Sequence, residues 1–283
     1  MELSVRDIMT ENPIIFKVPG TLSDAVDALV RNNITGMPVT DSNGIFAGVI
    51  SRRDIFNNPN ETQAAMVMRN AKTVNPEDSI EFAAREMIRQ RRRHIIVTDE
   101  SNRVIGILTP QNFLGIMAQR FPNVEIKNIR LGITFPMWEK TPLSVAYYTM
   151  RYSGTFANPI IDIEGVFKGL ITDRDLFDKI DIISNINRTN PGSDLDEDPW
   201  TWGGIRNMGS YFIERNQIKM PQETVESILI RDPVVAYSKE TIGSIANKMS
   251  KGNFNHLPVL EGPGRLSGML YDLDLMGVFD VKL

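Results

Sequence analysis

The stretch GVISRRDIF at positions 48–56 is matched by GLITDRDLF at positions 169–177, which lies 121 residues further along the chain. Both stretches hold a glycine, a serine or threonine, an aspartate and a phenylalanine at the same spacing. Similarity of this kind within one chain indicates an internal repeat, and a repeat that is missed leads to a wrong fold prediction. The first question is therefore how many copies the chain contains.

Extending the two stretches upstream reveals four copies. In every copy, four marker positions are separated by intervals of 16, 10 and 6 residues. The markers are Leu22, Pro38, Gly48 and Asp54 in copy one, Ile80, Ile96, Gly106 and Asn112 in copy two, Leu143, Pro159, Gly169 and Asp175 in copy three, and Ile242, Pro258, Gly268 and Asp274 in copy four. Because three intervals recur unchanged in all four copies, we interpret the unit as a true repeat.

Each copy predicts the same local structure. Thr21 is a favourable helix N-cap, and apolar residues follow it at helical spacing; the corresponding helices of the other copies begin after Ser79, Pro142 and Thr241. A short strand precedes this helix, and two strands follow it. The turn between these two strands holds Gly44, Asn102, Gly165 or Gly264. A second helix starts at the Ser/Thr-x-x-Asp position, which gives a β-α-β-β-α unit.

The predicted fold class is mixed α/β (α+β), with units at 1–60, 61–120, 121–180 and 222–283. Copies one and two start 58 residues apart. A unit of this size is small for a stable hydrophobic core, so we expect the copies to pair.

Residues 181–221 form an insertion between copies three and four. Its Asn, Pro, Gly and acidic residues predict irregular surface structure, followed by a short helix with Ile205, Met208 and Phe212. We interpret Trp200 and Trp202 as anchors of the insertion to the body of the protein, and the alternative is a partner-docking knob.

The composition excludes several classes of function. A hydrophobic content of 42% and a charged content of 23% are those of an ordinary globular protein. No apolar run approaches the roughly 20 residues that span a bilayer, and no signal peptide is evident, so we expect a cytoplasmic protein. The absence of cysteine excludes disulfides, thiolate metal sites and a cysteine nucleophile. A net charge of −4 disfavours general nucleic-acid binding but leaves room for a local basic pocket.

The motifs of common enzymes are absent. The sequence contains no G-x-x-x-x-G-K-[ST] loop, no H-E-x-x-H pair and no G-x-S-x-G elbow. Its two histidines, His94 and His256, lie in separate copies and make a poor metal site. We therefore expect no catalytic residues, no metal and no required cofactor.

The segments RDIM at 6–9 and TLSDAVDALVRNNITGMPVTDSNGIFAGVISRRDIF at 21–56 resemble a cystathionine-β-synthase (CBS) domain, and so do the other three copies. The resemblance covers nearly all of the chain outside 181–221. Four such domains resemble the γ subunit of AMP-activated protein kinase and stand-alone archaeal CBS proteins. The resemblance implies two Bateman modules, copy one with copy two and copy three with copy four, packed as a disc. It also implies clefts that often bind adenine nucleotides, whereas other members bind S-adenosyl ligands or NAD.

The Ser/Thr-x-x-Asp phrase has two interpretations that can hold together. Ser51 with Asp54, and Thr172 with Asp175, are spaced like capping boxes, which need no ligand. The resemblance implies instead that the aspartate binds a ribose diol, since a carboxylate offers paired acceptors to two donors. We expect Asp54 and Asp175 to be the main ribose sites. Asp274 ranks next, because Tyr271 replaces the hydroxyl residue, and Thr109 with Asn112 ranks last, as the weakest or an empty site.

The resemblance also suggests residues for the other parts of a nucleotide. Phosphate candidates are Arg52, Arg53, Arg93, His94, Arg174 and His256, with Arg151 and Lys251 weaker. For Arg91 and Arg92 we prefer an ordinary role as solvated charge at a helix C-terminus. Adenine candidates are Ile14, Ile15, Pro38 and Ile50 in copy one and Pro159 and Ile171 in copy three, for all of which core packing is the alternative.

These observations predict a non-catalytic regulatory protein that binds AMP, ADP or ATP between paired domains. Its effect would pass to an unidentified protein partner or through self-assembly, for example as a homodimer. One alternative is a scaffold whose clefts are degenerate. The others are binders of S-adenosyl ligands, NAD or nucleic acid, and the last is disfavoured by the net charge.

Overall fold

The computed structural model describes residues 3–58, 61–177, 179, 181–189, 211–219 and 221–279. Copy one contains β2 (Phe16–Lys17), α1 (Leu22–Arg31), β3 (Gly36–Thr40), β4 (Phe46–Ser51) and α2 (Arg52–Asn57). Copy two contains β5 (Thr73–Val74), α4 (Ile80–Gln90), β6 (Ile95–Thr98), β7 (Val104–Leu108) and α5 (Gln111–Arg120). Copy three contains β8 (Met137–Trp138), α6 (Leu143–Ser153), β9 (Ala157–Ile161), β10 (Phe167–Thr172) and α7 (Asp173–Phe177). Copy four contains β14 (Ala236–Tyr237), α8 (Ile242–Gly252), β15 (His256–Gly262), β16 (Arg265–Tyr271) and α9 (Asp272–Leu275). The β-α-β-β-α order predicted from the repeat is confirmed in all four copies.

Short segments connect these units. They are η1 (Val5–Asp7), β1 (Thr10–Glu11), α3 (Ala64–Val67), η2 (Ile126–Asn128), η3 (Val225–Ser227), β13 (Ile230–Arg231) and η4 (Met276–Phe279).

The local signals in the sequence account for the element boundaries. The hydroxyl of Thr21 accepts a hydrogen bond from the Asp24 amide at 3.1 Å, and Ser79 and Thr241 cap α4 and α8 in the same way. The four predicted turn residues all have positive φ, which glycine and asparagine adopt most easily. In every copy the first strand pairs in parallel with the second, which pairs antiparallel with the third.

The copies pair as one with two and three with four. An arm, the short extended segment before each unit, crosses to the sheet of the partner copy: Thr10 lies opposite Ile107, Arg69 opposite Val49, Gly132 opposite Met269, and Arg231 opposite Gly169. The repeated marker glycine stands at each crossing. A Cβ on Gly48 would come within 2.8 Å of the Arg69 carbonyl oxygen, and one on Gly169 within 2.2 Å of the Ile230 carbonyl oxygen. The marker is therefore glycine because an arm passes directly over it.

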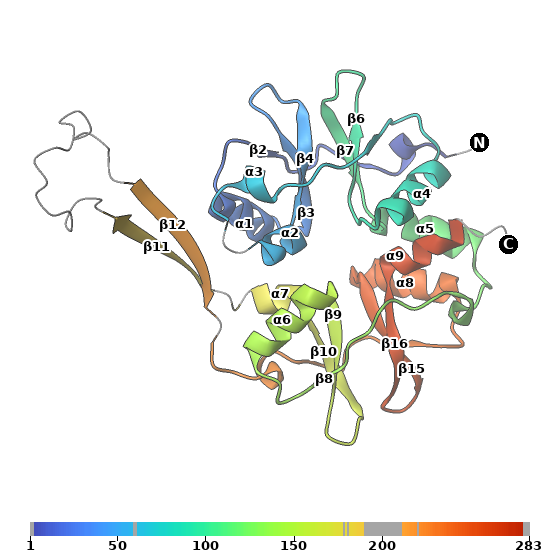
Figure 1. The fold of residues 1–283 in the computed structure, drawn as a ribbon. Helices are drawn as coiled ribbons and strands as arrows, with labels where there is room; N and C mark the ends of the chain where they lie inside the picture. Colours follow the sequence, from blue (N-terminus) through green and yellow to red (C-terminus); the bar gives the residue numbers. More distant parts are fainter. Residues whose placement is uncertain are drawn as a thin grey trace, which may run out of the picture.

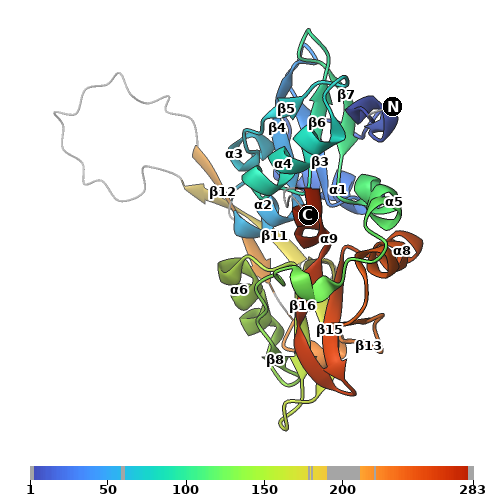
Figure 2. The same ribbon diagram turned by 90° about the vertical axis from the view of Figure 1, so that its right-hand side faces the viewer.

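The two modules pack through their helices into a disc with four lobes, which is narrower in the turned view (Figures 1 and 2). Helix α5 of copy two lies along α8 of copy four, and these copies share the largest hydrophobic core. Copy one meets copy three where Tyr147 packs on Phe56, with ring centroids 4.4 Å apart, and its hydroxyl donates to the Phe56 carbonyl at 3.0 Å. Each copy thus contacts one partner through its sheet and another through its helices, and all four meet at the centre.

The insertion differs from the prediction. Strands β11 (Asp181–Thr189) and β12 (Tyr211–Lys219) form an antiparallel pair that projects from the disc (Figure 1). Asp181 lies opposite Lys219, and Thr189 lies opposite Tyr211. Phe212 is therefore in a strand and not in a helix. The β-branched and aromatic residues of both segments favour strands, a signal that the turn-forming residues between them obscured. Ile205, Met208, Trp200 and Trp202 lie outside the described residues.

No helix in the described part of the chain combines the length and the apolar content needed to cross a membrane. Across the same residues, no group of three or more His, Asp or Glu side chains is arranged to hold a metal ion.

Candidate functional site

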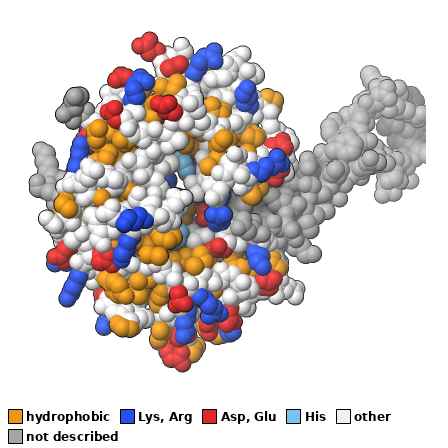
Figure 3. Space-filling view, turned by 180° about the vertical axis from the view of Figure 1, so that it is seen from behind, with side chains coloured by type: hydrophobic (Ala, Val, Ile, Leu, Met, Phe, Trp, Pro, Cys, Tyr) orange, Lys and Arg blue, Asp and Glu red, His pale blue; other side chains and the backbone are white. Residues whose placement is uncertain are grey.

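A cavity of about 1170 Å³ lies where the four copies meet. Its walls come from the Ser/Thr-x-x-Asp turns of copies one and three, the segments before β6 and β15, and the arms of copies one, two and four. Seen from behind, the centre of the disc is hollowed, and pale-blue histidine atoms are visible there (Figure 3). A cavity of this volume exceeds the usual size of a pocket for one small ligand.

The lining of the cavity is strongly basic. Its arginines are Arg52, Arg53, Arg69, Arg91, Arg92, Arg93 and Arg174, and its carboxylates are those of Asp54, Asp173 and Asp175. These seven arginines and three aspartates carry a positive excess, although the whole chain is acidic. Cations that converge from several elements on one cavity favour an anionic ligand.

In copy one, the carboxylate of Asp54 is fully engaged by the protein. Its Oδ2 accepts hydrogen bonds from the Ser51 amide at 3.0 Å and the Ser51 hydroxyl at 2.6 Å. Its Oδ1 lies 2.6 Å from Nε of Arg69, which belongs to the arm of copy two. The residue is 4% exposed. The predicted capping box is present, and an ion pair occupies the oxygen that the box leaves over.

In copy three, the equivalent carboxylate keeps an open oxygen. Oδ2 of Asp175 accepts from the amide and the hydroxyl of Thr172, both at 2.7 Å. Its Oδ1 has no hydrogen-bond or ion-pair partner among the described residues, and Asp175 lines the cavity. The turn is otherwise a copy of the Ser51–Asp54 turn, so the two sites differ in what faces the second oxygen.

In copy two, the equivalent position is committed to the fold. The amide nitrogen of Asn112 donates to the Ile8 carbonyl at 2.8 Å and to the Thr10 hydroxyl at 3.2 Å, while its oxygen accepts from Thr109. The nitrogen of the side chain thus holds the arm of copy one, and its oxygen holds the turn before α5.

In copy four, Tyr271 fills the space beside Asp274. Only half of a capping box forms, since the Tyr271 amide donates to Asp274 at 2.9 Å while the phenol hydroxyl donates to the Ala157 carbonyl at 2.9 Å. Burial raises the pKa of Asp274 to about 6, against hydrogen bonds from Tyr271 and Gly132. A raised carboxyl pKa means that this residue favours folding at low pH, and that the contribution is lost as the pH rises through about 6. Asp274 does not line the cavity.

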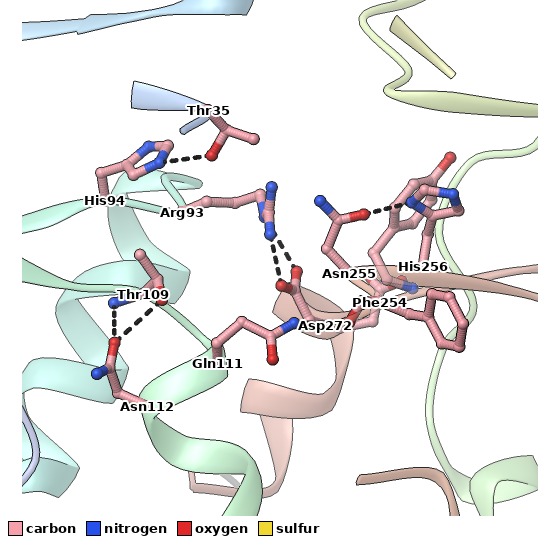
Figure 4. Close-up of polar contacts among 12 residues, drawn as sticks. Thr35, Arg93, His94, Thr109, Gln111, Asn112, Phe254, Asn255, His256 and Asp272 are labelled. Carbon is pink, nitrogen blue, oxygen red and sulfur yellow. Dashed lines mark hydrogen bonds and ion pairs between the residues drawn. The ribbon is translucent and has the colours of Figure 1, made fainter. Parts of the chain in front are cut away.

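A polar network joins copies two and four at the centre (Figure 4). Nε and Nη2 of Arg93 donate to the two carboxylate oxygens of Asp272 at 3.1 and 2.6 Å. In Figure 4 the Asn255 amide nitrogen faces Arg93 and its oxygen faces Nδ1 of His256. The exchanged orientation satisfies both neighbours, because the oxygen then accepts from Nη1 of Arg93 at 3.1 Å and the amide nitrogen donates to Nδ1 of His256. Burial acts to lower the pKa of Arg93, but Asp272 outweighs it, so the pKa is raised. The pair joins the two modules.

A second contact between the modules joins copies one and three. The guanidinium of Arg53 lies 4.9 Å from the ring centroid of Phe156, a cation–π arrangement. Burial, followed by the charge of Arg69, lowers the pKa of Arg53. Burial also raises the pKa of Asp173, although Arg52 and Arg93 oppose the shift. Module one therefore presents arginines where module two presents aspartates.

His94 gives the protein a predicted sensitivity to acid. Burial, with the nearby charges of Arg93 and Arg92, lowers its pKa to about 3, and its Nε2 lies 3.0 Å from the Thr35 hydroxyl. Because the unfolded chain binds this proton near pH 6.5, stability is lost as the pH falls from 6.5 toward 3. We expect His94→Gln to remove about 1–2 kcal/mol of the stability difference between pH 7.5 and pH 5, measured by urea unfolding. An unchanged difference would mean that His94 is not the titrating group.

The cavity brings together most of the predicted site residues. Those that line it are Ser51, Arg52, Arg53, Asp54, Arg93, His94, Thr109, Thr172, Arg174, Asp175 and His256, together with Ile14 and Pro38. Ile15, Pro159, Asn112 and Asp274 are outside this lining. Ile50 and Ile171 are fully buried in hydrophobic cores, which differs from the expected contact with adenine. Successive residues of a strand face opposite sides, so Val49 and Ser51 reach the cavity while Ile50 does not.

Other residues at the site escaped the sequence analysis. Arg69 lies in an arm, outside the marker positions, and Ile230 occupies the same place in the arm of copy four. Asp173 and Asp272 stand directly after the Ser/Thr/Tyr position, where copy one has Arg52, and this charge reversal between modules was the available signal. Arg91 and Arg92, interpreted as solvated, also line the cavity.

Comparison with known proteins places these features in a family. The CBS domain model matches residues 5–61, 64–119 and 225–280, and copy three, outside these ranges, has the same fold. An uncharacterized conserved protein of Pyrococcus horikoshii has a similar structure, with a TM-score of 0.65 and 26% identity over 98% of this chain and 100% of that chain. Protein MJ1225 of Methanocaldococcus jannaschii has a TM-score of 0.77 at 18% identity, over 98% and 100% of the two chains. In sequence, MJ1225 is 24% identical over 191 residues, 61% of this chain and 68% of that protein.

Some similar proteins are enzymes, but the similarity covers a small part of them. A homoserine O-acetyltransferase of Methanocorpusculum labreanum is 27% identical over 112 residues, which is 38% of this chain and 23% of the enzyme. Among the described residues, β11 and β12 are the elements that belong neither to the four copies nor to their arms and connections. These two strands form no catalytic domain.

Proposed function

The chain belongs to the CBS-domain family, and from this premise we propose that it is a non-catalytic regulatory protein that binds adenine nucleotides in its central cavity. The observation that carries the proposal is that two equivalent aspartates, Asp54 and Asp175, line one cavity together with seven arginines. A carboxylate suits the vicinal diol of ribose, and guanidinium groups suit phosphate. The archaeal protein MJ1225, a candidate homologue of the γ subunit of AMP-activated protein kinase, supports the same class of function.

Each part of the nucleotide has candidate residues in the cavity. Asp175 would hold the ribose most readily, because one of its oxygens is open, and Asp54 would hold a second. Arg53 and Arg174 line the cavity and would bind phosphate. Ile14, Pro38 and Ile230 also line it and would contact the base. Binding would be read by a protein partner, because ligand bound at the centre touches both modules and favours one arrangement of them.

The proposal is tested by calorimetric titration with AMP, ADP and ATP. Separate titrations with S-adenosylmethionine, NAD and a short RNA test the alternative ligand classes. We expect an adenine nucleotide to bind, and Asp54→Asn with Asp175→Asn to weaken it at least tenfold, because hydrogen bonds to a charged group contribute about 1.5–3 kcal/mol each. Asparagine keeps an acceptor for the capping box and removes the second acceptor of the diol.

Asp24→Asn is the matched control. Asp24 forms the same capping box with Thr21, but it lies on the surface at the start of α1 and does not line the cavity. We expect nucleotide affinity to be unchanged in this variant. Binding of no adenine nucleotide, or equal binding by the double variant, contradicts the proposed function and favours a scaffold.

A further inference from the structure

The arms that cross beside the Asp54 and Asp175 turns carry different side chains at the equivalent place. Arg69 lies opposite Val49, and Ile230 lies opposite Leu170, which follows the marker glycine of copy three as Val49 follows that of copy one. The carbonyl oxygens of Arg69 and Ile230 both lie over the marker glycine, and both residues line the cavity. The arm of copy two therefore presents a cation beside Asp54, whereas the arm of copy four presents an apolar side chain beside Asp175.

Arg69 pairs with the neighbouring aspartate. Its Nε lies 2.6 Å from Oδ1 of Asp54. Its backbone amide and carbonyl both form hydrogen bonds with Val49 at 2.9 Å, which fixes the position of its Cα atom. Since Ser51 occupies Oδ2, neither oxygen of Asp54 is available to a diol while this ion pair persists. The side chain of Arg69 is 46% exposed and lines the cavity, so it can move aside without disturbing the core.

Arg231, the next residue of the arm of copy four, does not line the cavity. Its Nη2 lies 3.6 Å from Oε1 of Glu226. The difference between the two clefts thus follows from one position of the arm, where arginine in copy two pairs with Asp54 and isoleucine in copy four leaves Oδ1 of Asp175 without a partner among the described residues.

A ligand that binds Asp54 through its ribose must displace Arg69. The displaced guanidinium would remain beside Arg53, whose pKa is lowered by burial and then by the charge of Arg69. A neutral riboside offers that cation nothing, whereas a phosphate gives it a new counter-ion.

We propose that Arg69 makes the copy-one cleft selective for phosphorylated over neutral ribosides, by guarding Asp54 and then requiring an anion when it is displaced. This inference rests on the proposed function and concerns the copy-one cleft alone. The copy-three cleft has no such guard, and its preference for phosphate comes only from the arginines around it.

The test uses the full chain with Asp175→Asn, which leaves the copy-one cleft, and titrates it with AMP and with adenosine. We expect AMP to bind at least tenfold more tightly than adenosine. Adding Arg69→Met should tighten adenosine and weaken AMP, so that the ratio of their dissociation constants falls at least tenfold. The gain in adenosine affinity discriminates, because an arginine that only contacts phosphate would leave adenosine binding unchanged.

Arg231→Met in the same background is the matched control, since Arg231 lies in the arm of copy four, outside the cavity lining, and pairs with Glu226; the ratio should not change. A measurement without substitution at Arg69 is also decisive: inorganic phosphate should tighten adenosine binding at least threefold, because it stabilises the displaced guanidinium. An unchanged ratio in Arg69→Met, or no coupling between phosphate and adenosine, overturns the inference while AMP binding persists. Loss of AMP binding in every background would overturn the proposed function itself.

Discussion

Arg93→Met is expected to lower the free energy of unfolding by about 3–5 kcal/mol, because it leaves the Asp272 carboxylate buried without its counter-ion. The Asp272 side chain is 0% exposed and that of Arg93 is 13% exposed, and two parallel hydrogen bonds join them between copy two and copy four. Methionine retains much of the side-chain volume, so the loss reports the charge and hydrogen bonds more than a void. Urea unfolding followed by circular dichroism gives the difference.

Two further variants separate the contribution of this ion pair from general effects. Arg89→Met removes an arginine of the same copy that pairs with Glu86 on the surface, with a side chain 57% exposed, and should cost less than about 1 kcal/mol. The double variant Arg93→Met with Asp272→Leu should recover most of the loss, since no buried charge remains unpaired. A loss below about 1 kcal/mol for Arg93→Met would show that water reaches the pair and that the modules do not depend on it.

The same network shows how far sequence can predict this site. Three fixed intervals predict the repeat unit from local sequence patterns, and the small core of one unit predicts that the copies pair. Asp54, Asp175 and the arginines beside them follow from the marker spacing, and the structure gathers them around one cavity. The partners of these side chains do not follow, since Arg69 and Arg93 meet carboxylates supplied by other copies.

Copy four shows a second limit. The sequence indicates that Tyr271 cannot complete a capping box, but not that its hydroxyl reaches the Ala157 carbonyl of copy three. Strand direction has the same limit: Ile50 is apolar and adjacent to Ser51, yet the alternation of the strand places it in the core. Long-range contacts, and the side of a strand on which a residue lies, therefore require the three-dimensional fold, whereas repeat spacing and helix caps can be predicted from the sequence.

Gly169→Ala is expected to destabilise the protein by about 3–4 kcal/mol and to detach the arm of copy four from β10. Gly169 has a φ of +152°, which costs an L-residue about 1–3 kcal/mol. A Cβ there would also lie 2.2 Å from the Ile230 carbonyl oxygen, a backbone atom that can move only if β13 leaves β10. Urea unfolding measures the loss, and hydrogen exchange at Ile230 and Arg231 measures the detachment.

Gly262→Ala is the matched control, because it lies in β15 with no heavy atom within 4 Å of the added Cβ, and it should change stability by no more than about 0.5 kcal/mol. The arm carries Ile230 into the cavity beside Asp175, so Gly169→Ala should also weaken nucleotide binding in the copy-three cleft. The copy-one cleft has its own crossing at Gly48 and should retain its affinity. If Gly169→Ala unfolds like the control, the close approach of the arms is not the reason that glycine recurs at this marker, and the repeat needs a different physical explanation.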